Sequence, residues 1–180
     1  GWTGNGTTAI SGSAGPYRLT CDGTNDYLSV PLNDSSLPSF SLGVWLNWSG
    51  GTDGVFSWAS GLSSGMPRVL VNTANNLKIY NGSYFVNDAA LSTNAWNYLV
   101  ITYDNASTTW AAYLNGTLLG TDSRSPQSGT QLYLGNGFGG DGYFSGHFGP
   151  VSVYNTPLTQ SQIRQNCNAL KTRFSGAVCN

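Results

Sequence analysis

The stretch FSLGVWLNW, residues 40–48, decides the fold class of this chain. Its apolar side chains recur at every second position, so they share one face of an extended strand. These side chains are Phe40, Leu42, Val44 and Leu46. Trp45 and Asn47 fall on the other face. A period of two over so many residues predicts a β-strand with one face on the core.

Shorter strand patterns run through the rest of the chain and alternate with turn residues. The predicted strands are 18–21, 26–31, 40–48, 54–59, 68–71, 77–80, 84–86, 96–104, 109–114, 117–121, 131–135 and 147–154. Asn115-Gly116 is a strong hairpin signal, because both residues tolerate a positive φ. Regular short strands with glycine-rich turns predict an all-β, antiparallel β-sandwich.

One segment, 160–173, is predicted to be helical. Ile163, Cys167 and Leu170 recur there at helical spacing, and Thr159 is a suitable N-cap. The sandwich is therefore expected to end in one short C-terminal helix.

The length of 180 residues fits a single domain with its own core. Residues 1–16 are rich in Gly, Ser and Thr and lack periodicity. We expect them to form an N-terminal arm or linker, and residues 17–180 to form the domain.

The stock of catalytic groups is small. The chain has eight aspartates and no glutamate, whereas glycoside hydrolysis normally needs a pair of carboxylates, one of them held protonated. The single histidine, His147, has no acidic neighbour in the sequence and is expected in a strand, facing solvent or a hydroxyl. Motifs of serine hydrolases and zinc peptidases do not occur. We therefore expect that the protein is not an enzyme.

Composition also excludes two classes of partner. The seven basic residues are scattered and the net charge is −1, so the electrostatic signature of a nucleic-acid-binding protein is missing. No apolar run reaches the length of a membrane span, so membrane insertion is not expected. Only 8% of residues are charged, and the many Asn, Ser, Thr and aromatic residues are typical of β proteins outside cells or on virions.

Several motifs with a shared order carry a resemblance to a known family. They are CDGTNDY (21–27), SFSLGVW (39–45), NAWNYLVITYD (94–104), YLNG (113–116), LYLG (132–135), YFSG (143–146) and VYNTPLT (153–159). Together they resemble the laminin G-like (pentraxin-like) branch of the concanavalin A-like lectin/glucanase superfamily, over about residues 17–174. Residues 163–174 resemble versions of this domain in phage and other viral structural proteins. The resemblance implies a jelly-roll of two curved sheets, with ligand sites on the concave sheet or the rim loops.

The sequence departs from the family pattern at two places. Family members usually carry Phe where Cys21 stands, and an acidic residue at or near Gly149-Pro150. A proline inside the last predicted strand implies an edge position or a bulge.

The three cysteines allow two interpretations. Cys167 and Cys179 could close a short loop that pins the C-terminal tail, and we favour a disulfide between them with Cys21 free. The alternative is three buried thiols that behave as small apolar residues.

Calcium is the cofactor that the resemblance suggests, and no other is expected. Related domains often bind it at the rim, and oxygen ligands from Asp and Asn suit this cation. Asp22, Asn25 and Asp26 share one turn, and Asp141 approaches them if the first and last strands pair. The alternative is ordinary turns closed by Asx hydrogen bonds, which the lack of an acidic residue near Gly149 favours.

Carbohydrate binding needs aromatic rings beside amides or carboxylates. Two polar–aromatic groups meet this description: Trp48, Asp53 and Trp58 around a glycine-rich loop, and Asn81, Tyr84 and Asn87. The alternative is that these aromatic residues pack in the core, as most do in a β-sandwich.

These observations predict a non-catalytic adhesion module, extracellular or on a virion surface, that binds cell-surface carbohydrate. Each site would bind weakly, and multiple copies on a particle would supply avidity. The alternative is a virion structural or decoration protein that binds capsid or tail subunits and no sugar, with residues 1–16 as a docking arm.

Overall fold

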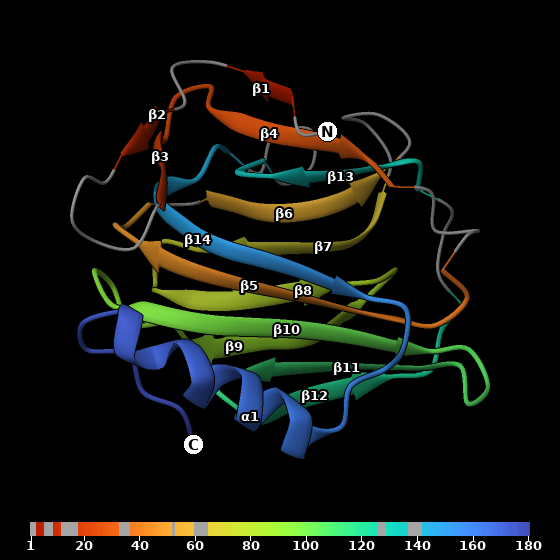
Figure 1. Cartoon of the computed structure of the whole chain (residues 1–180). Coiled ribbons are helices and arrows are strands. Elements are labelled where there is room, and N and C mark those ends of the chain that lie inside the picture. The colour runs from red at the N-terminus through yellow and green to blue at the C-terminus, as the bar shows by residue number, and fades with distance from the viewer. Residues whose placement is uncertain are drawn as a thin grey trace.

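The computed structural model consists of two stacked antiparallel sheets, and seven strands are described in each (Figure 1). It describes residues 3–5, 9–11, 18–32, 37–51, 53–59, 65–125, 129–136 and 142–180. The strand order is β1-β4-β13-β6-β7-β8-β9 in sheet A and β12-β11-β10-β5-β14-β3-β2 in sheet B. The predicted antiparallel sandwich of the concanavalin A-like type is confirmed.

The bounds of the elements follow the order of each sheet. Sheet A consists of β1 (Thr3–Asn5), β4 (Tyr27–Pro31), β13 (Gln131–Leu134), β6 (Asp53–Ala59), β7 (Gly65–Val71), β8 (Asn76–Tyr80) and β9 (Tyr84–Ala90). Sheet B consists of β12 (Thr117–Asp122), β11 (Thr109–Leu114), β10 (Trp96–Asp104), β5 (Phe40–Trp48), β14 (Ser145–Tyr154), β3 (Arg18–Asp22) and β2 (Ala9–Ser11). The helix α1 (Gln160–Leu170) continues into the 3-10 turn η2 (Lys171–Arg173).

The N-terminal residues differ from the arm that the sequence predicts. β1 pairs with β4 in sheet A, and β2 pairs with β3 in sheet B, so both extend an edge of the sandwich. Strands of three residues are too short to show alternation, and their pairing depends on partners later in the chain. The sandwich therefore includes residues on the N-terminal side of residue 17.

The main core lies between the sheets and confirms the alternation in β5. Its sheet B side includes Phe40, Leu42, Val44, Leu46 and Trp48 from β5, with Leu99, Ile101 and Tyr103 from β10. Its sheet A side includes Phe56, Trp58, Val69, Val71, Leu77 and Ile79. These side chains are almost fully buried, and burial of this apolar surface is the main force that holds the two sheets together.

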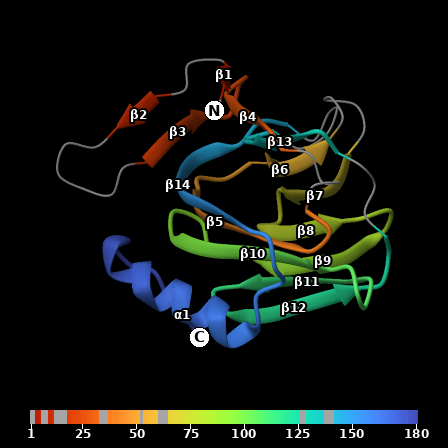
Figure 2. The same cartoon turned by 45° about the vertical axis from the view of Figure 1, so that its right-hand side comes forward.

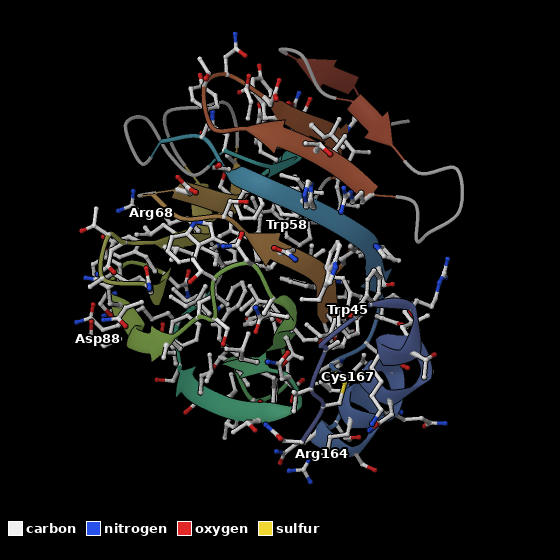
Figure 3. All side chains as sticks on the ribbon, turned by 90° about the vertical axis from the view of Figure 1, so that its left-hand side faces the viewer. Trp45, Trp58, Arg68, Asp88, Arg164 and Cys167 are labelled. Carbon is white, nitrogen blue, oxygen red and sulfur yellow. A yellow bond between two sulfur atoms is a disulfide. The ribbon has the colours of Figure 1, made fainter. Side chains whose placement is uncertain are left out.

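A second core covers the outer face of sheet B. Trp45 and Tyr98 point away from the main core and pack with Ile163 and Cys167 of α1 and with Phe174. The Trp45 ring stacks on Tyr98 at 5.1 Å and on Phe174 at 4.6 Å between ring centroids. Figures 2 and 3 show α1 against this face, and Figure 3 shows Trp45 and Cys167 on the same side of the molecule.

The ends of α1 are fixed by side-chain and tail contacts. The Thr159 hydroxyl accepts a hydrogen bond from the Gln162 N–H at 3.3 Å, and Gln162 Oε1 accepts one from the Thr159 N–H at 2.9 Å. This capping box confirms Thr159 as the N-cap. The α-helix ends at Leu170, and the rest of the predicted helix is the 3-10 turn.

The C-terminal tail is tied to the sandwich at two points. Cys167 and Cys179 form a disulfide with a Cα–Cα distance of 5.8 Å, which is the pairing that the sequence favoured, and Cys21 is free and buried. The Asn180 N–H donates to the Asn115 carbonyl at 2.7 Å. Asn115 (φ 54°) and Gly116 (φ 86°) form the hairpin turn that their sequence predicted.

The last strand in the chain, β14, pairs with both β5 and β3 and therefore lies between these two early strands in sheet B. Its register shifts between Phe148 and Val151, as the proline predicted. Gly149 allows a close approach there, because a Cβ atom would lie 3.0 Å from Trp45 Cβ and 3.1 Å from Phe174 Cζ.

Candidate functional site

The outer face of sheet A carries a row of polar and aromatic side chains. Tyr133 pairs with Ser57, Ser57 with Arg68, Arg68 with Tyr80, and Tyr80 with Tyr84 across five neighbouring strands. Core side chains alternate with these positions along β13, β6, β7 and β8, so the row points away from the main core. A bulge in β9 keeps Tyr84 on this face while Val86 enters the core.

The exposed end of this row forms a compact group. The ring centroids of Tyr80 and Tyr84 are 5.1 Å apart in an edge-to-face arrangement, and Tyr84 is 42% exposed. Arg68 Cζ lies 4.5 Å from the centre of the Tyr80 ring, and Lys78 Nζ lies 5.4 Å from that of Tyr84. We call Arg68, Lys78, Tyr80 and Tyr84 the tyrosine–cation platform. Figure 3 shows Arg68 on the side opposite α1.

The other end of the row is more enclosed. Tyr133 is only 6% exposed, and its hydroxyl donates to Gln131 Oε1 at 2.6 Å. Burial raises the pKa of Tyr133, and the neighbouring Tyr27 adds to this effect. Tyr27 and Tyr143 are half-buried, with ring centroids 6.4 Å apart. These tyrosines mainly pack the edge of the face.

The prediction that Trp48 and Trp58 stack on sugar is wrong. Trp48 is 0% exposed and Trp58 2%, so neither ring has a face that a ligand could reach. Trp48 Nε1 donates to Asp53 Oδ2 at 2.7 Å, and Trp58 Nε1 donates to the Leu32 carbonyl at 2.8 Å. Both indoles belong to the main core, which is the alternative that the sequence left open.

Asp53 is also a structural residue. Its Oδ2 accepts hydrogen bonds from Trp48 and from the Ser145 N–H, the latter at 3.1 Å. Burial raises the pKa of Asp53, and these two hydrogen bonds oppose the rise. The carboxylate therefore joins β5, β6 and β14 inside the fold and is not available to a ligand.

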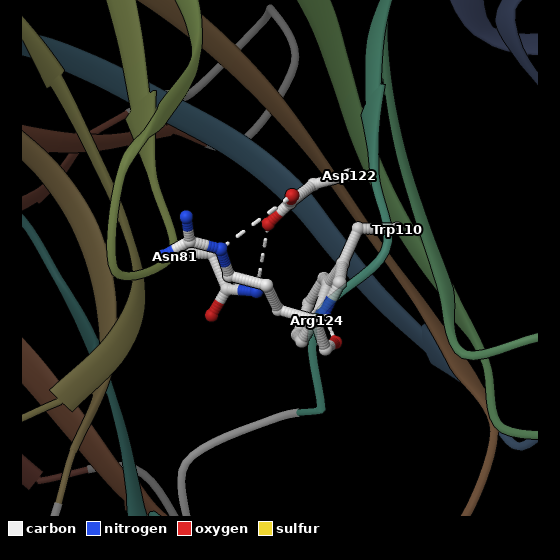
Figure 4. Close-up of polar contacts among 4 residues, drawn as sticks. All are labelled: Asn81, Trp110, Asp122 and Arg124. Carbon is white, nitrogen blue, oxygen red and sulfur yellow. Dashed lines mark hydrogen bonds and ion pairs between the residues drawn. The ribbon is translucent and has the colours of Figure 1, made fainter.

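Asn81 is buried as well, which contradicts its assignment to a sugar site. Its Nδ2 donates to Asp122 Oδ2 at 3.4 Å, and Arg124 Nε lies 3.8 Å from Asp122 Oδ1 (Figure 4). Trp110 Nε1 donates to the Arg124 carbonyl at 2.7 Å. This network links the β8–β9 turn of sheet A to β12 of sheet B. Within the predicted second group, Tyr84 and Asn87 are the exposed members.

The turn proposed for calcium is closed by its own hydrogen bonds. The Asp22 N–H donates to Asp26 Oδ2 at 3.0 Å, and the Thr24 N–H donates to Asp22 Oδ1 at 2.8 Å. Asn25 is exposed, Asp26 is buried, and Asp141 lies outside the described residues. Among the described residues, no cluster of three or more His, Cys or Asp side chains could hold a metal ion. The geometry of the described part matches the Asx-turn alternative.

The two remaining reactive side chains lie near β3. His147 Nδ1 is 3.1 Å from the Thr20 hydroxyl, so the histidine faces a hydroxyl as expected. Burial lowers the pKa of His147, and Arg18 adds to this effect. Burial raises the pKa of Cys21 to about 12, with smaller effects of Asp26 and Asp22, so the thiol stays protonated and unreactive at neutral pH.

Sequence reasoning missed three members of the platform: Arg68, Lys78 and Tyr80. All three lie in strands that the alternation predicted, and Lys78 and Tyr80 alternate with the core residues Leu77 and Ile79. That alternation was the available signal. It could not show that the opposite sheet has its outer face covered by a helix.

No helix in the described part of the chain is long and apolar enough to cross a membrane.

Comparisons with known proteins agree with this fold. The family model described as the concanavalin A-like lectin/glucanases superfamily (Laminin_G_3) matches residues 22–164. No curated protein sequence matches the chain.

Three solved structures illustrate the similarity. Domain 4 of AbnA, a GH43 extracellular arabinanase from Geobacillus stearothermophilus in complex with arabinotriose, has a TM-score of 0.66 and 18% identity over 91% of this chain and 85% of that one. The binding domain of botulinum neurotoxin DC in complex with rat synaptotagmin II has a TM-score of 0.66 and 14% identity over 94% of this chain and 46% of that one. A heptameric SAP-like pentraxin from Limulus polyphemus has a TM-score of 0.57 and 14% identity over 87% and 78%. At these identities the likeness shows a shared fold.

Proposed function

The chain belongs to the concanavalin A-like lectin/glucanases superfamily, and on this basis we propose that it is a non-catalytic carbohydrate-binding module. It acts outside the cell or on the surface of a particle, where it attaches its carrier to surface glycans. The ligand lies on the outer face of sheet A, over the tyrosine–cation platform. The observation that carries the proposal is the pair of tyrosine rings, the exposed Tyr84 and the half-buried Tyr80, with a cation beside each.

The chemistry of the platform suits a sugar. An exposed aromatic ring offers an apolar surface to the C–H face of a pyranose, while nearby donors take its hydroxyl groups. Arg68 and Lys78 supply such donors, and their contacts with the rings hold them in place. The exposed Asn87 lies on the neighbouring strand β9. A shallow face of this kind binds each sugar weakly, so multiple copies are needed for firm attachment.

The carboxylates of the chain support binding without catalysis. The chain has no glutamate, and the carboxylate of Asp53 is buried and bonded within the fold. Asp88, an exposed acid on β9, accepts a hydrogen bond from Asn76 Nδ2 at 3.2 Å. The platform itself contains no carboxylate, whereas glycoside hydrolysis normally needs two. The arabinanase domain with bound arabinotriose is a relative in fold that binds a sugar.

The test is a glycan array probed with a multivalent display of the chain. The hits are then measured as Kd values for wild type, Tyr84→Ala and Tyr80→Ala. Loss of a stacked ring is expected to weaken binding about ten-fold. Leu118→Ala is the matched control, because Leu118 is 46% exposed on β12 of sheet B and its loss should leave the Kd unchanged. Equal Kd values for wild type and both tyrosine variants would contradict the platform.

Calcium dependence is measured in the same assay with and without EDTA. Because Asp22 and Asp26 bond within their own turn, we expect binding to persist in EDTA. Loss of binding in EDTA, restored by calcium, would add a rim cation to the proposal.

The second candidate is a structural or decoration protein of a virion that binds other subunits. The toxin domain in complex with synaptotagmin II is a relative in fold that binds a protein. An array without hits, together with stable binding to capsid or tail subunits, would replace the carbohydrate proposal with this one.

A further inference from the structure

A groove with a volume of about 310 Å³ opens at the edge of the sandwich opposite to the tyrosine–cation platform. Its floor is apolar and consists of Leu19, Leu28, Phe148 and Pro150. Arg18 and Arg173 line it as well, the first from β3 and the second from η2. Two residues that are far apart in the sequence thus bring their positive charges to one depression.

The groove exists because two strands stop pairing at this point. β3 pairs with β14 from Asp22 to Leu19, and Leu19 lies opposite Phe148. Beyond Phe148, β14 bulges at Gly149 and Pro150, and neither residue is paired with β3. Pro150 has no N–H, so an added strand could not form a regular ladder here. A compact ligand therefore suits the groove better than an extended peptide.

The charges in the groove are available to a ligand. Arg18 and Arg173 are exposed, and within the described part of the chain neither guanidinium forms an ion pair with a carboxylate. The chain carries only seven basic residues and a net charge of −1, so two arginines at one groove are a local concentration of positive charge. Burial and, to a smaller extent, Arg18 lower the pKa of His147 on the neighbouring strand β14, in keeping with a positive charge at this edge.

We infer that this groove binds an acidic sugar residue, with its carboxylate between Arg18 and Arg173 and its C–H face on the apolar floor. Guanidinium groups bind a carboxylate through paired N–H donors, which fix its orientation as well as its charge. Leu19, Leu28 and Pro150 offer the apolar surface that the ring carbons need. The volume lies at the small end of the range for ligand sites, which suits one sugar residue. This site is separate from the platform and does not depend on it.

The test is a titration of the 15N-labelled chain with D-glucuronate, followed by amide shifts. Glucuronate is expected to shift the amides of Leu19, Phe148 and Arg173 with a Kd in the millimolar range. Glucose and the methyl ester of glucuronate have a sugar ring without the charge and should leave these amides unmoved. Raising the salt concentration should weaken binding, because exposed charges are screened.

Variants locate the site. Arg18→Gln and Arg173→Gln should each weaken glucuronate binding about ten-fold or more, because each loses a charged pair of hydrogen bonds. Arg18→Lys keeps the charge but not the paired donors, so an intermediate Kd is expected. Arg164→Gln, which removes an exposed arginine of α1 outside the groove, is the control and should bind like wild type. Equal melting temperatures of wild type and all variants confirm that the variants are folded.

Three outcomes would overturn the inference. In the first, Arg18→Gln and Arg173→Gln bind glucuronate as wild type does. In the second, inorganic sulfate binds as tightly as glucuronate, which would make the groove a site for a bare anion. In the third, Tyr84→Ala abolishes glucuronate binding and the arginine variants do not, which would move the acidic sugar to the platform and leave the proposed function intact.

Discussion

The two outer faces of the sandwich have similar side chains and opposite environments. Sheet B presents Trp45, Trp96 and Tyr98, which lie beneath α1 and Phe174. Sheet A presents Tyr80 and Tyr84, which have two cations beside them, whereas α1 packs on sheet B. An aromatic residue on an outward position of a strand therefore does not by itself mark a ligand site. What distinguishes the faces is whether a later segment of the chain covers them.

The cover over sheet B is built from several modest contacts. The capping box of Thr159 and Gln162 starts the helix, and Phe174 closes over Trp45. The disulfide and the Asn180–Asn115 hydrogen bond hold the tail. Each fixes a different part of one segment, so the aromatic rings under it are kept out of water. The same rings without this cover would be a large exposed apolar patch.

The largest difference between the faces is expected on truncation of an aromatic ring. Trp45→Ala should lower the free energy of unfolding by about 4 kcal/mol, because a fully buried ring leaves a cavity in the second core. Tyr84→Ala should lower it by about 1 kcal/mol or less, since that ring is partly in water. Chemical denaturation of both variants gives the two values. Equal losses would show that the face of sheet A is as much a core as that of sheet B.

The disulfide offers a second way to separate the faces. Replacing Cys167 and Cys179 by alanine should cost about 3 kcal/mol, because the unfolded chain regains the freedom of the closed loop. Hydrogen exchange should become faster at Ile163 and Asn180 and stay unchanged at Ile79 in sheet A. A uniform increase over both sheets would contradict a local role of the tail.

Long strands and turns could be predicted from the sequence because their signals are local. The bounds of 40–48, 96–104 and 109–114 match the structure, since each has several alternating positions. The Asn115-Gly116 turn and the Thr159 cap each depend on a few neighbouring residues. The strands at 3–5 and 9–11 lack such signals, since their pairing partners come later in the chain.

The errors at the candidate site have a different cause. Trp48 follows Phe40, Leu42, Val44 and Leu46 at every second position of the strand, so the alternation already places it on the core face. Trp58 likewise lies two positions after the core residue Phe56 and therefore on the same face of its strand. A glycine-rich loop beside an aromatic residue is a weaker signal than the period of the strand that carries the residue. The place of Arg68 and Lys78 in a candidate ligand site could not be inferred from the sequence, because it depends on which sheet α1 covers.

Asp53 tests whether the residues first assigned to a sugar site belong to the core. Asp53→Ala should cost roughly 2 kcal/mol, because Trp48 Nε1 and the Ser145 N–H lose their buried acceptor. Sugar binding, measured on correctly folded protein, should not change. A loss of affinity at unchanged stability would return Asp53 to the ligand site.

Asp53→Asn adds a pH dependence with a defined sign. The folded state raises the pKa of this carboxyl above its ordinary value of 3.8, so folding favours its protonated form. The contribution of Asp53 to stability is therefore greatest at acid pH and falls as the pH rises through the folded pKa. The stability of Asp53→Asn relative to wild type should rise over this interval. A relative stability that is flat or falls with pH would contradict the raised pKa.

The smallest expected effect is the coupling energy of a single contact on each face. It shows whether the aromatic contacts of that face hold the fold together or leave the rings available to a ligand. A double-mutant cycle on Trp45 and Phe174, stacked at 4.6 Å, should give a coupling energy of about 1 kcal/mol that does not change with salt. A cycle on Lys78 and Tyr84, 5.4 Å apart, should give about 0.5 kcal/mol or less, and added salt should reduce it. Weak coupling means that a ligand can replace the contact between Lys78 and Tyr84 at little cost in free energy. A coupling on the open face as strong as that under α1 would instead make the platform a structural element, and binding there would have to break it.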